Sequence, residues 1–194
     1  MSFWKRLFNP GKRRSESENP DGGDGVPGLS AIMTTTAFRD RFKKEDINAK
    51  PDVLDGCLKM VKSYFMDNNI EMPIPELVTH PKNLDQTMDE GMGFALYCQA
   101  FKMAESEAGM FLAYAFSDYL IQHYGFELYT DQKPEYPLRG MTLKYDKSGT
   151  VLSLYPFEYS MKVLNHQASF SGMIAQLDAA LPKLPDTDDL LNNL

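Results

Sequence analysis

The sequence predicts an α+β domain in which N-terminal helices pack on a small three-stranded antiparallel sheet that is followed by two C-terminal helices. Three changes of pattern carry this prediction. Apolar residues recur at helical spacing from residue 51 to about 124, at strand-like spacing from 126 to 155, and again at helical spacing from 156 to about 181. Helices, then a meander of strands, then helices are typical of α+β domains.

The first predicted helix covers "PDVLDGCLKMVKSYFMDNN", beginning at Pro51 and ending at the Asn68-Asn69 pair. The prolines of the next stretch, "IEMPIPELVTHP", predict an extended connector, because a proline cannot continue a helix. The stretch "NLDQTMDEGMGFALYCQAFKMA" is predicted to be helical in its second half, after Gly91 and Gly93.

The stretch "SEAGMFLAYAFSDYLIQHYG" is the clearest helix of the sequence, because it has one wide apolar face and a glycine, Gly125, at its end. Three strands follow, in "FELYT", "MTLKY" and "TVLSLY". The turn "DKSG", Asp146 to Gly149, is predicted to join the last two strands as a hairpin. A helix then runs from Pro156 to about Leu164, and a last helix covers "ASFSGMIAQLDAALPKL".

Composition divides the chain into four segments. Residues 1–14 form a basic amphipathic segment, and residues 15–36 have the Gly, Pro, Ser and charged content of a disordered linker. Residues 37–185 form the single predicted α+β domain, and residues 186–194 form an acidic tail.

Charge is distributed unevenly along the chain. The formal net charge is −7, yet residues 1–14 hold five basic residues and no acid. The rest of the chain therefore has 15 basic residues against 27 acidic ones, a net charge of −12. Because nucleic-acid binding requires clustered Lys and Arg, the sequence predicts no nucleic-acid partner.

Cysteine usage and hydropathy indicate the compartment. Cys57 and Cys98 lie in apolar helical patterns and are predicted to be buried free thiols, which fits a reducing environment. No apolar run approaches the roughly 20 residues of a membrane-spanning helix, and no apolar stretch of a secretory signal follows the first basic residues. The predicted location is the cytoplasm, with attachment to the inner face of the membrane through residues 1–14.

Residues 1–14, "MSFWKRLFNPGKRR", carry the strongest functional signal, and we call them the N-terminal segment. Its apolar residues share one helical face, and its cations suit an anionic surface, at about 1 kcal/mol per basic residue. The alternatives are a frayed start before a charged linker and a segment that docks on another protein. The predicted membrane or partner contacts are Phe3, Trp4, Lys5, Arg6, Leu7, Phe8, Lys12, Arg13 and Arg14.

Familiar catalytic and cofactor-binding patterns are missing from the sequence, which has no GxSxG, no GxxxxGK[ST], no GxGxxG after a strand and no HExxH. We therefore predict no cofactor, no metal site and no catalytic residue. The candidate contacts with a ligand or partner are Tyr129, Arg139 and Tyr155, on one face of the predicted sheet. Arg139 follows Pro137 and can clamp a carboxylate or a phosphate, and the simpler alternative is an ion pair with a surface acid.

The stretch "YPFEY" joins the third predicted strand to the next helix. Pro156 suits the first helical position, and Glu158 then lies in the first turn, where the helix dipole favours a carboxylate. The prediction for Glu158 is a structural role, and a catalytic carboxylate is the alternative.

Two short motifs stand out in the C-terminal half: the step Tyr124-Gly125-Phe126-Glu127 after the long helix, and Tyr155-Pro156-Phe157 at a strand end before a basic helix. With these motifs, the chain from about residue 90 to 182 resembles a bacterial family of small domains of unknown function. Leu128 stands where that family usually has Trp, and Val163 replaces the second residue of a basic pair that would begin at Lys162. The resemblance implies the fold and a bacterial origin, and it implies no activity.

The predicted function is that of a non-catalytic domain that acts through protein or surface contacts, with the N-terminal segment as its attachment. One alternative is an immunity-protein-like or chaperone-like adaptor, since an acidic domain attracts a basic partner. The other is an enzyme whose site the sequence does not reveal.

Overall fold

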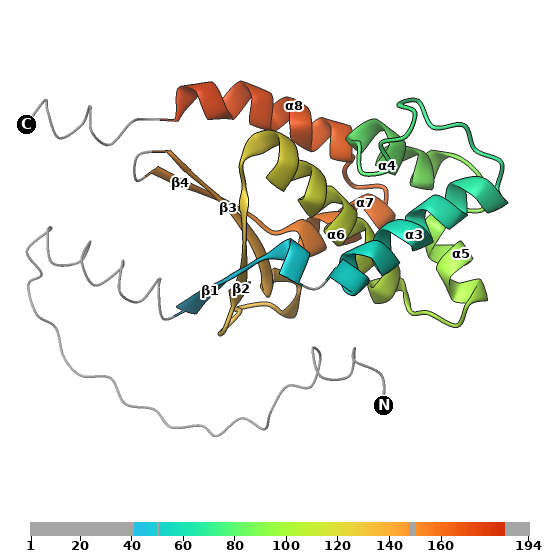
Figure 1. Cartoon of the computed structure of the whole chain (residues 1–194), viewed down its shortest axis with the longest axis horizontal. Helices are drawn as coiled ribbons and strands as arrows, with labels where there is room; N and C mark the ends of the chain where they lie inside the picture. Colours follow the sequence, from blue (N-terminus) through green and yellow to red (C-terminus); the bar gives the residue numbers. More distant parts are fainter. Residues whose placement is uncertain (1–40, 50, 148–149, 185–194) are drawn as a thin grey trace, which may run out of the picture. The chain divides into compact units, whose positions relative to one another are not determined.

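A four-stranded antiparallel sheet and six α-helices make up the part of the chain that this computed structural model describes, residues 41–49, 51–147 and 150–184 (Figure 1). The predicted α+β class is confirmed. The predicted N-terminal segment, linker and acidic tail lie outside these residues. Residues 37–40, at the start of the predicted domain, lie outside them as well.

The sheet has one strand more than the three predicted. Its order is β1-β2-β3-β4, with β1 at Phe42–Glu45, β2 at Glu127–Asp131, β3 at Met141–Lys147 and β4 at Thr150–Leu154, and each neighbouring pair is antiparallel. The prediction of β2, β3 and β4 is confirmed. Strand β1 was not predicted, and it corrects the expected strand number. It pairs with β2, with Phe42 opposite Asp131 and Glu45 opposite Leu128.

The sequence of β1, FKKE, explains why it was missed. It has one apolar residue, and its charged side chains make ion pairs instead of contributing to the core. Lys44 pairs with Glu127 on β2 at 2.5 Å, and Arg41, just before the strand, pairs with Asp131. Lysines on a short edge strand also discourage pairing with a strand of another chain.

The helix predicted at Pro51 is α3, Pro51–Asp67, and its buried residues recur at helical spacing: Leu54, Cys57, Val61, Tyr64 and Phe65. The stretch predicted to be helical only in its second half, after Gly91 and Gly93, is helical in both halves, which corrects that prediction. Helix α4 covers Pro81–Asp89 and α5 covers Phe94–Ala100. Pro81 occupies the start of α4, where a missing N–H costs no hydrogen bond, and the His80 side chain accepts a hydrogen bond from the amide of Lys82. Helix α4 has few apolar residues, so its sequence shows only a weak helical period.

The long predicted helix is α6, Glu105–Tyr124, and it is the centre of the domain (Figure 1). It contacts α3, α4, α5 and the C-terminal helix α7, Pro156–Leu164, as well as β2, and its apolar residues are buried on nearly all sides. Gly125 ends it in the left-handed conformation at φ 73°, where a residue without a Cβ is favoured.

The two C-terminal helices are confirmed as α7, Pro156–Leu164, and α8, Phe170–Ala180. Helix α7 packs along α6 and contacts β3, whereas α8 contacts α4. Short 3₁₀ turns lie at Ile47–Ala49, Pro137–Arg139 and Leu181–Lys183. No helix within the described ranges is both long and apolar enough to cross a bilayer.

Candidate functional site

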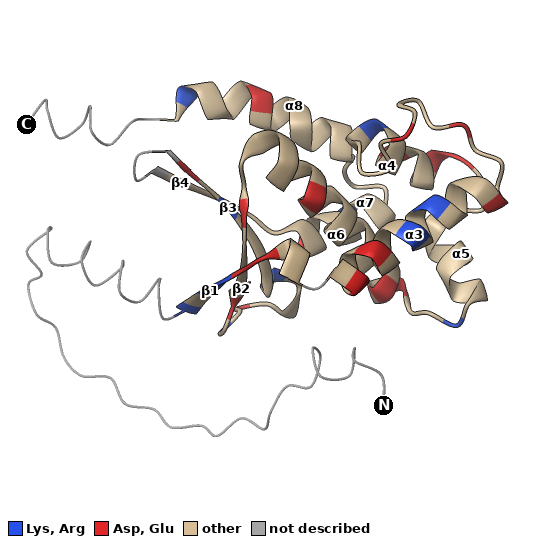
Figure 2. Cartoon of the chain, viewed as in Figure 1, with Lys and Arg blue, Asp and Glu red and all other residues tan. Residues whose placement is uncertain are grey.

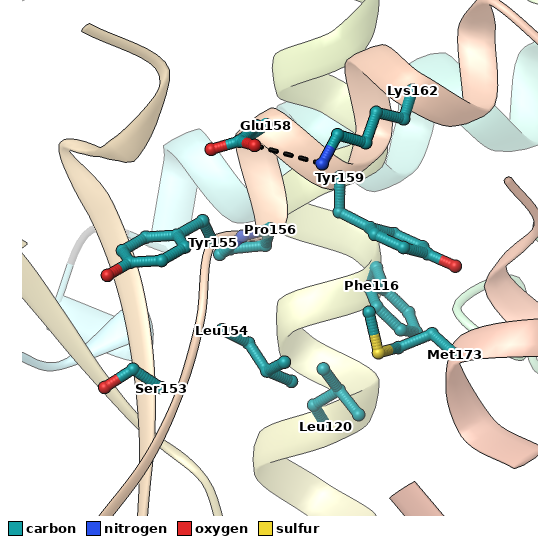
Figure 3. A pocket seen from close by; sticks show the side chains of 10 residues that line it. All are labelled: Phe116, Leu120, Ser153, Leu154, Tyr155, Pro156, Glu158, Tyr159, Lys162 and Met173. Atoms are coloured by element: carbon teal, nitrogen blue, oxygen red, sulfur yellow. Dashed lines mark ion pairs between the residues drawn. The ribbon is translucent and has the colours of Figure 1, made fainter. Parts of the chain in front are cut away.

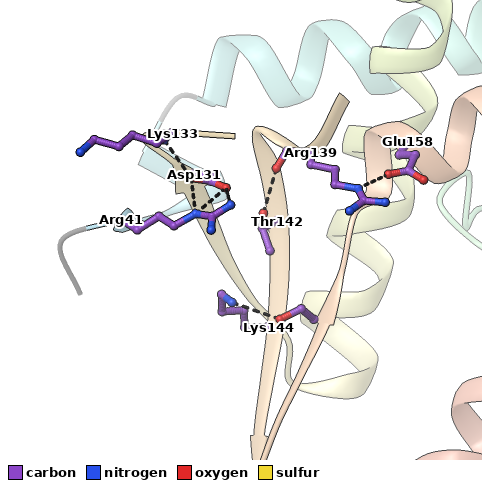
Figure 4. Close-up of polar contacts among 8 residues, drawn as sticks. Arg41, Asp131, Lys133, Arg139, Thr142, Lys144 and Glu158 are labelled. Atoms are coloured by element: carbon purple, nitrogen blue, oxygen red, sulfur yellow. Dashed lines mark hydrogen bonds and ion pairs between the residues drawn. The ribbon is translucent and has the colours of Figure 1, made fainter. Parts of the chain in front are cut away.

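Arg139 and Tyr155, two of the three residues singled out in the sequence, lie together, and Glu158 joins them. Arg139 ends the 3₁₀ turn Pro137–Arg139, Tyr155 follows β4, and Glu158 lies in the first turn of α7. Nε of Arg139 donates to Oε2 of Glu158 at 2.6 Å (Figure 4). The guanidinium carbon of Arg139 lies 4.9 Å from the centroid of the Tyr155 ring. The ring of Tyr136 lies at the same distance from that carbon.

Glu158 is an ionised carboxylate between two cations. Its other oxygen, Oε1, lies 3.0 Å from Nζ of Lys162, one turn further along α7. The hydrogen bond from Arg139 lowers the pKa of Glu158, burial opposes this, and Lys162 lowers it further. Glu158 thus has the predicted place in the first helical turn, and the ion pair that the sequence offered as the simpler role for Arg139 is present.

Two hollows flank the Glu158–Lys162 pair. One has a volume of about 160 Å³ and lies between β4, α6, α7 and α8, with Phe116, Tyr159 and Met173 among its lining residues (Figure 3). The other has a volume of about 450 Å³ and is lined by Arg139, Glu158 and Lys162 together with Tyr136. We call the larger one the Arg139 hollow.

Tyr129 belongs to a different polar group, on the sheet. Its hydroxyl donates to Oε2 of Glu127, two residues earlier on β2, at 2.9 Å. The hydrogen bonds from Lys44 and from Tyr129 lower the pKa of Glu127. The predicted trio is therefore divided, with Arg139 and Tyr155 at the α7 end and Tyr129 in the β1–β2 ladder.

A third polar group ties β1 to the sheet (Figure 4). Both carboxylate oxygens of Asp131 accept hydrogen bonds from Arg41, at 2.7 to 3.0 Å, and Oδ1 also accepts from the backbone amide of Lys133 at 2.9 Å. Lys144 donates to Ser153 at 3.1 Å and lies 3.9 Å from the centroid of Phe42. Burial lowers the pKa of Lys144.

The most exposed apolar side chains near one another in the sequence lie on α5 and at its two ends. Met92 is 54%, Leu96 58% and Phe101 54% exposed. Figure 1 shows α5 at the end of the domain that is remote from the sheet. We call Met92, Leu96 and Phe101 the α5 surface; these three residues were not among the predicted contacts. The signal was present, because α5 buries Phe94 and Tyr97 yet has a further apolar residue, Leu96, outside that stripe.

The loop before α5 is fixed by a buried tyrosine. The hydroxyl of Tyr64 on α3 donates to the carbonyl oxygen of Glu90 and accepts from the amide of Gly93 at 3.0 Å. Both glycines that flank Met92 have positive φ, 71° at Gly91 and 84° at Gly93. The hydroxyl of Tyr97 donates to Asp67 at 2.5 Å, which attaches α5 to the end of α3. The α5 surface is therefore held in place by contacts beneath it.

Acidic residues surround this surface. Residues 64–107 contain eight Asp and Glu against two Lys, a net charge of −6, half of the −12 carried outside the N-terminal segment. Acidic residues are spread over the helices at this end and over the loop between α3 and α4 (Figure 2). Asp67, Asp89, Glu90 and Glu105 are all exposed.

The remaining predictions concern the N-terminal segment and metal binding. The segment's nine named residues, Phe3 to Arg14, lie outside the part of the chain that the structure describes. Within the described part, no group of three or more His, Cys, Asp or Glu side chains is arranged to hold a metal ion. Comparison of the chain with protein-family models, with curated proteins and with solved structures gives no match in any of the three. The resemblance of residues 90–182 to a bacterial family stays a prediction.

Proposed function

We propose that the domain is a non-catalytic binding module that takes a basic protein partner through the α5 surface. The observation that supports this most is the exposure of Leu96 on α5 and of Met92 and Phe101 at its two ends, in a helix that buried contacts hold in place. Each such side chain contributes up to about 1.5–3 kcal/mol when a partner removes it fully from water.

The charge around the surface argues for a basic partner. An apolar centre with charged residues around it is the usual arrangement of a protein interface. The net charge of −6 over residues 64–107 repels an acidic protein and raises the encounter rate with a basic one. Lys102 is the single basic residue beside α5 in this stretch, against Asp89, Glu90, Glu105 and Glu107 on either side.

The test compares capture of proteins from native-cell extract by the wild-type chain and by Leu96→Glu. The matched control is Val151→Glu, which places the same charge on an exposed apolar residue of β4, 45% exposed. We expect one basic protein that Leu96→Glu loses and Val151→Glu retains, and whose purified form binds the wild-type chain one to one. Salt should weaken that binding, because exposed charges are screened.

Three results would contradict the proposal. Equal capture by both variants would show that the α5 surface is not part of the interface. An acidic partner, or binding that salt does not affect, would contradict the argument from charge. Concentration-dependent dimers in sedimentation equilibrium that Leu96→Glu abolishes would make a second copy of the chain the occupant.

We also propose weak, reversible attachment of the chain to anionic membrane through the N-terminal segment. Five cations and four large apolar residues within the first fourteen positions support it. The two proposals are independent, because one concerns residues 1–14 and the other concerns α5.

A further inference from the structure

The guanidinium group of Arg139 is held in place, yet within the described residues only its Nε makes a hydrogen bond. Its Nε donates to Glu158, and its carbon lies 4.9 Å from the centroids of both the Tyr136 and the Tyr155 rings. Within the described residues, its two terminal nitrogens make no hydrogen bond. Two aromatic contacts and one ion pair fix the side chain, so little rotamer entropy is left to lose when a ligand binds.

The space beside this group has the size and lining of a ligand site. The Arg139 hollow, of about 450 Å³, lies within the range of small-molecule sites, roughly 300–1,000 Å³. Leu138, Met161 and the ring of Tyr136 give it an apolar wall, and Arg139 and Lys162 supply positive charge. Lys162 is half exposed, so its ammonium group can move toward a ligand.

The net charge of the side chains that line the hollow favours some anions over others. Among the residues that line the hollow, Arg139 and Lys162 contribute two positive charges and Glu158 one negative, a net charge of +1 for the lining, and Glu135 acts on Arg139 from outside it. A carboxylate neutralises this charge, whereas a phosphate dianion exceeds it and meets the fixed carboxylate of Glu158. A carboxylate also fits the paired terminal nitrogens of an arginine with two parallel hydrogen bonds.

We propose that the Arg139 hollow binds a carboxylate that carries an apolar group, with Arg139 and Lys162 holding the carboxylate and Tyr136, Leu138 and Met161 contacting the apolar group. Such a carboxylate is found both at the C-terminus of a polypeptide and in free organic acids. This site is separate from the α5 surface and does not depend on the binding function proposed there.

The experiment titrates the full ¹⁵N-labelled chain with N-acetyl-leucine and, in parallel, with its neutral amide. We expect N-acetyl-leucine to bind at least tenfold more tightly than the amide, because an ionised acceptor strengthens its hydrogen bonds. The largest shifts should fall on the Arg139 Nε–H and on the amides of Lys162 and Gln167. Equal binding of acid and amide, or shifts that map elsewhere, would overturn the proposal.

Two variants and a control assign the effect to charge. Arg139→Gln should lower the affinity for N-acetyl-leucine about tenfold or more, and Lys59→Gln, a lysine on α3, should leave it unchanged. Glu158→Gln raises the net charge of the hollow from +1 to +2. It should tighten N-acetyl-leucine binding and allow phenyl phosphate to bind. Weaker binding in a folded Glu158→Gln chain, or tighter binding of phenyl phosphate than of N-acetyl-leucine to the wild type, would contradict the charge argument.

A further arm separates the two sources of the carboxylate. A pentapeptide that ends in a free leucine carboxylate is compared with N-acetyl-leucine. Tighter binding of the peptide supports a polypeptide C-terminus, and equal binding supports a free organic acid. A pentapeptide with an amidated C-terminus that bound as tightly as the free acid would overturn the proposal.

Discussion

Asp131 illustrates, at the scale of one residue, how a charge that the sequence does not single out holds an edge of the fold. Its side chain is 1% exposed and accepts from Arg41 and from the amide of Lys133. Burial alone would raise the pKa of Asp131, but these hydrogen bonds outweigh burial and the pKa is lowered. The carboxylate is therefore ionised, and it holds Arg41, the residue before β1, against β2.

The first prediction is that Asp131→Asn lowers the free energy of unfolding by about 1–3 kcal/mol at neutral pH, because it removes hydrogen bonds to a charged group. Since the pKa of Asp131 is lower in the folded state, its contribution is present above the unfolded-state pKa and is lost as pH falls through the folded-state pKa. Urea unfolding at neutral pH and near pH 3 should show a smaller difference between wild type and variant at the lower pH.

Asp55→Asn is the control, because Asp55 is an exposed partner of Lys59 on α3 and such pairs contribute about 0–1 kcal/mol. A loss at Asp131→Asn no larger than that at Asp55→Asn would show that the Arg41 pair does not hold β1.

The candidate contacts show how far single residues can be predicted from sequence. Tyr129, Arg139 and Tyr155 were predicted to lie on one face of the sheet. Arg139 precedes β3 and Tyr155 follows β4, and the antiparallel pairing of these strands brings the two ends together. Tyr129 lies within β2, and its hydroxyl binds Glu127 instead. Sequence spacing predicts which strand a side chain lies on. It does not predict which group a flexible polar side chain binds, because that depends on the three-dimensional arrangement of its neighbours.

At the scale of an element, the α4–α5 loop shows a backbone that only glycine suits. Gly91 has φ 71°, and a Cβ at this position would lie 2.8 Å from the hydroxyl oxygen of Tyr64. That hydroxyl binds both Glu90 and Gly93, so displacing it would release the loop that precedes α5. The two glycines weakened the helix prediction in the sequence, and here they form the joint between two helices.

The second prediction is that Gly91→Ala lowers the free energy of unfolding by about 1–3 kcal/mol, because it combines a left-handed backbone with a displaced hydroxyl. Gly56→Ala is the matched control on α3, where nothing lies within 4 Å of the added Cβ. It should raise stability by about 0.5–1 kcal/mol, because alanine favours a helix. Chemical unfolding of both variants measures the difference, and equal effects would contradict the role given to the loop.

The elements that the sequence did not predict share a physical reason. Strand β1 has one apolar residue and is held by ion pairs, and α4 is short and polar, with Asn83 buried in its first turn. The Asn83 side chain donates to the carbonyls of Ile74 and Leu77 and accepts from the amide of Ile74. Period-based prediction detects apolar stripes, so elements held by polar contacts give it little signal.

At the scale of the whole molecule, the α+β class was predictable because long stretches keep one kind of pattern, and α6 is apolar along most of its length. The α5 surface was not predictable, because exposure of Leu96 or Phe101 depends on which side of α5 other helices cover. Charge was informative at this scale, because the contrast between a basic start and an acidic remainder is a property of the sequence alone.

That contrast leads to the last prediction, that the full chain floats with phosphatidylserine vesicles and that a chain lacking residues 1–14 does not. The cations supply attraction of about 1 kcal/mol each near an anionic surface, while the remaining net charge of −12 opposes it. Attachment should therefore be weak, absent from phosphatidylcholine vesicles and reduced by salt.

Two variants separate charge from apolar contact in that experiment. Neutralising Lys12, Arg13 and Arg14 to Gln should remove the preference for anionic lipid, and Trp4→Ser with Phe8→Ser should weaken flotation while retaining its salt dependence. Urea unfolding should give the same midpoint for the full and shortened chains, because the helices and strands described above begin after residue 40. Equal flotation of the full chain and the chain lacking residues 1–14 would contradict membrane attachment through the N-terminal segment.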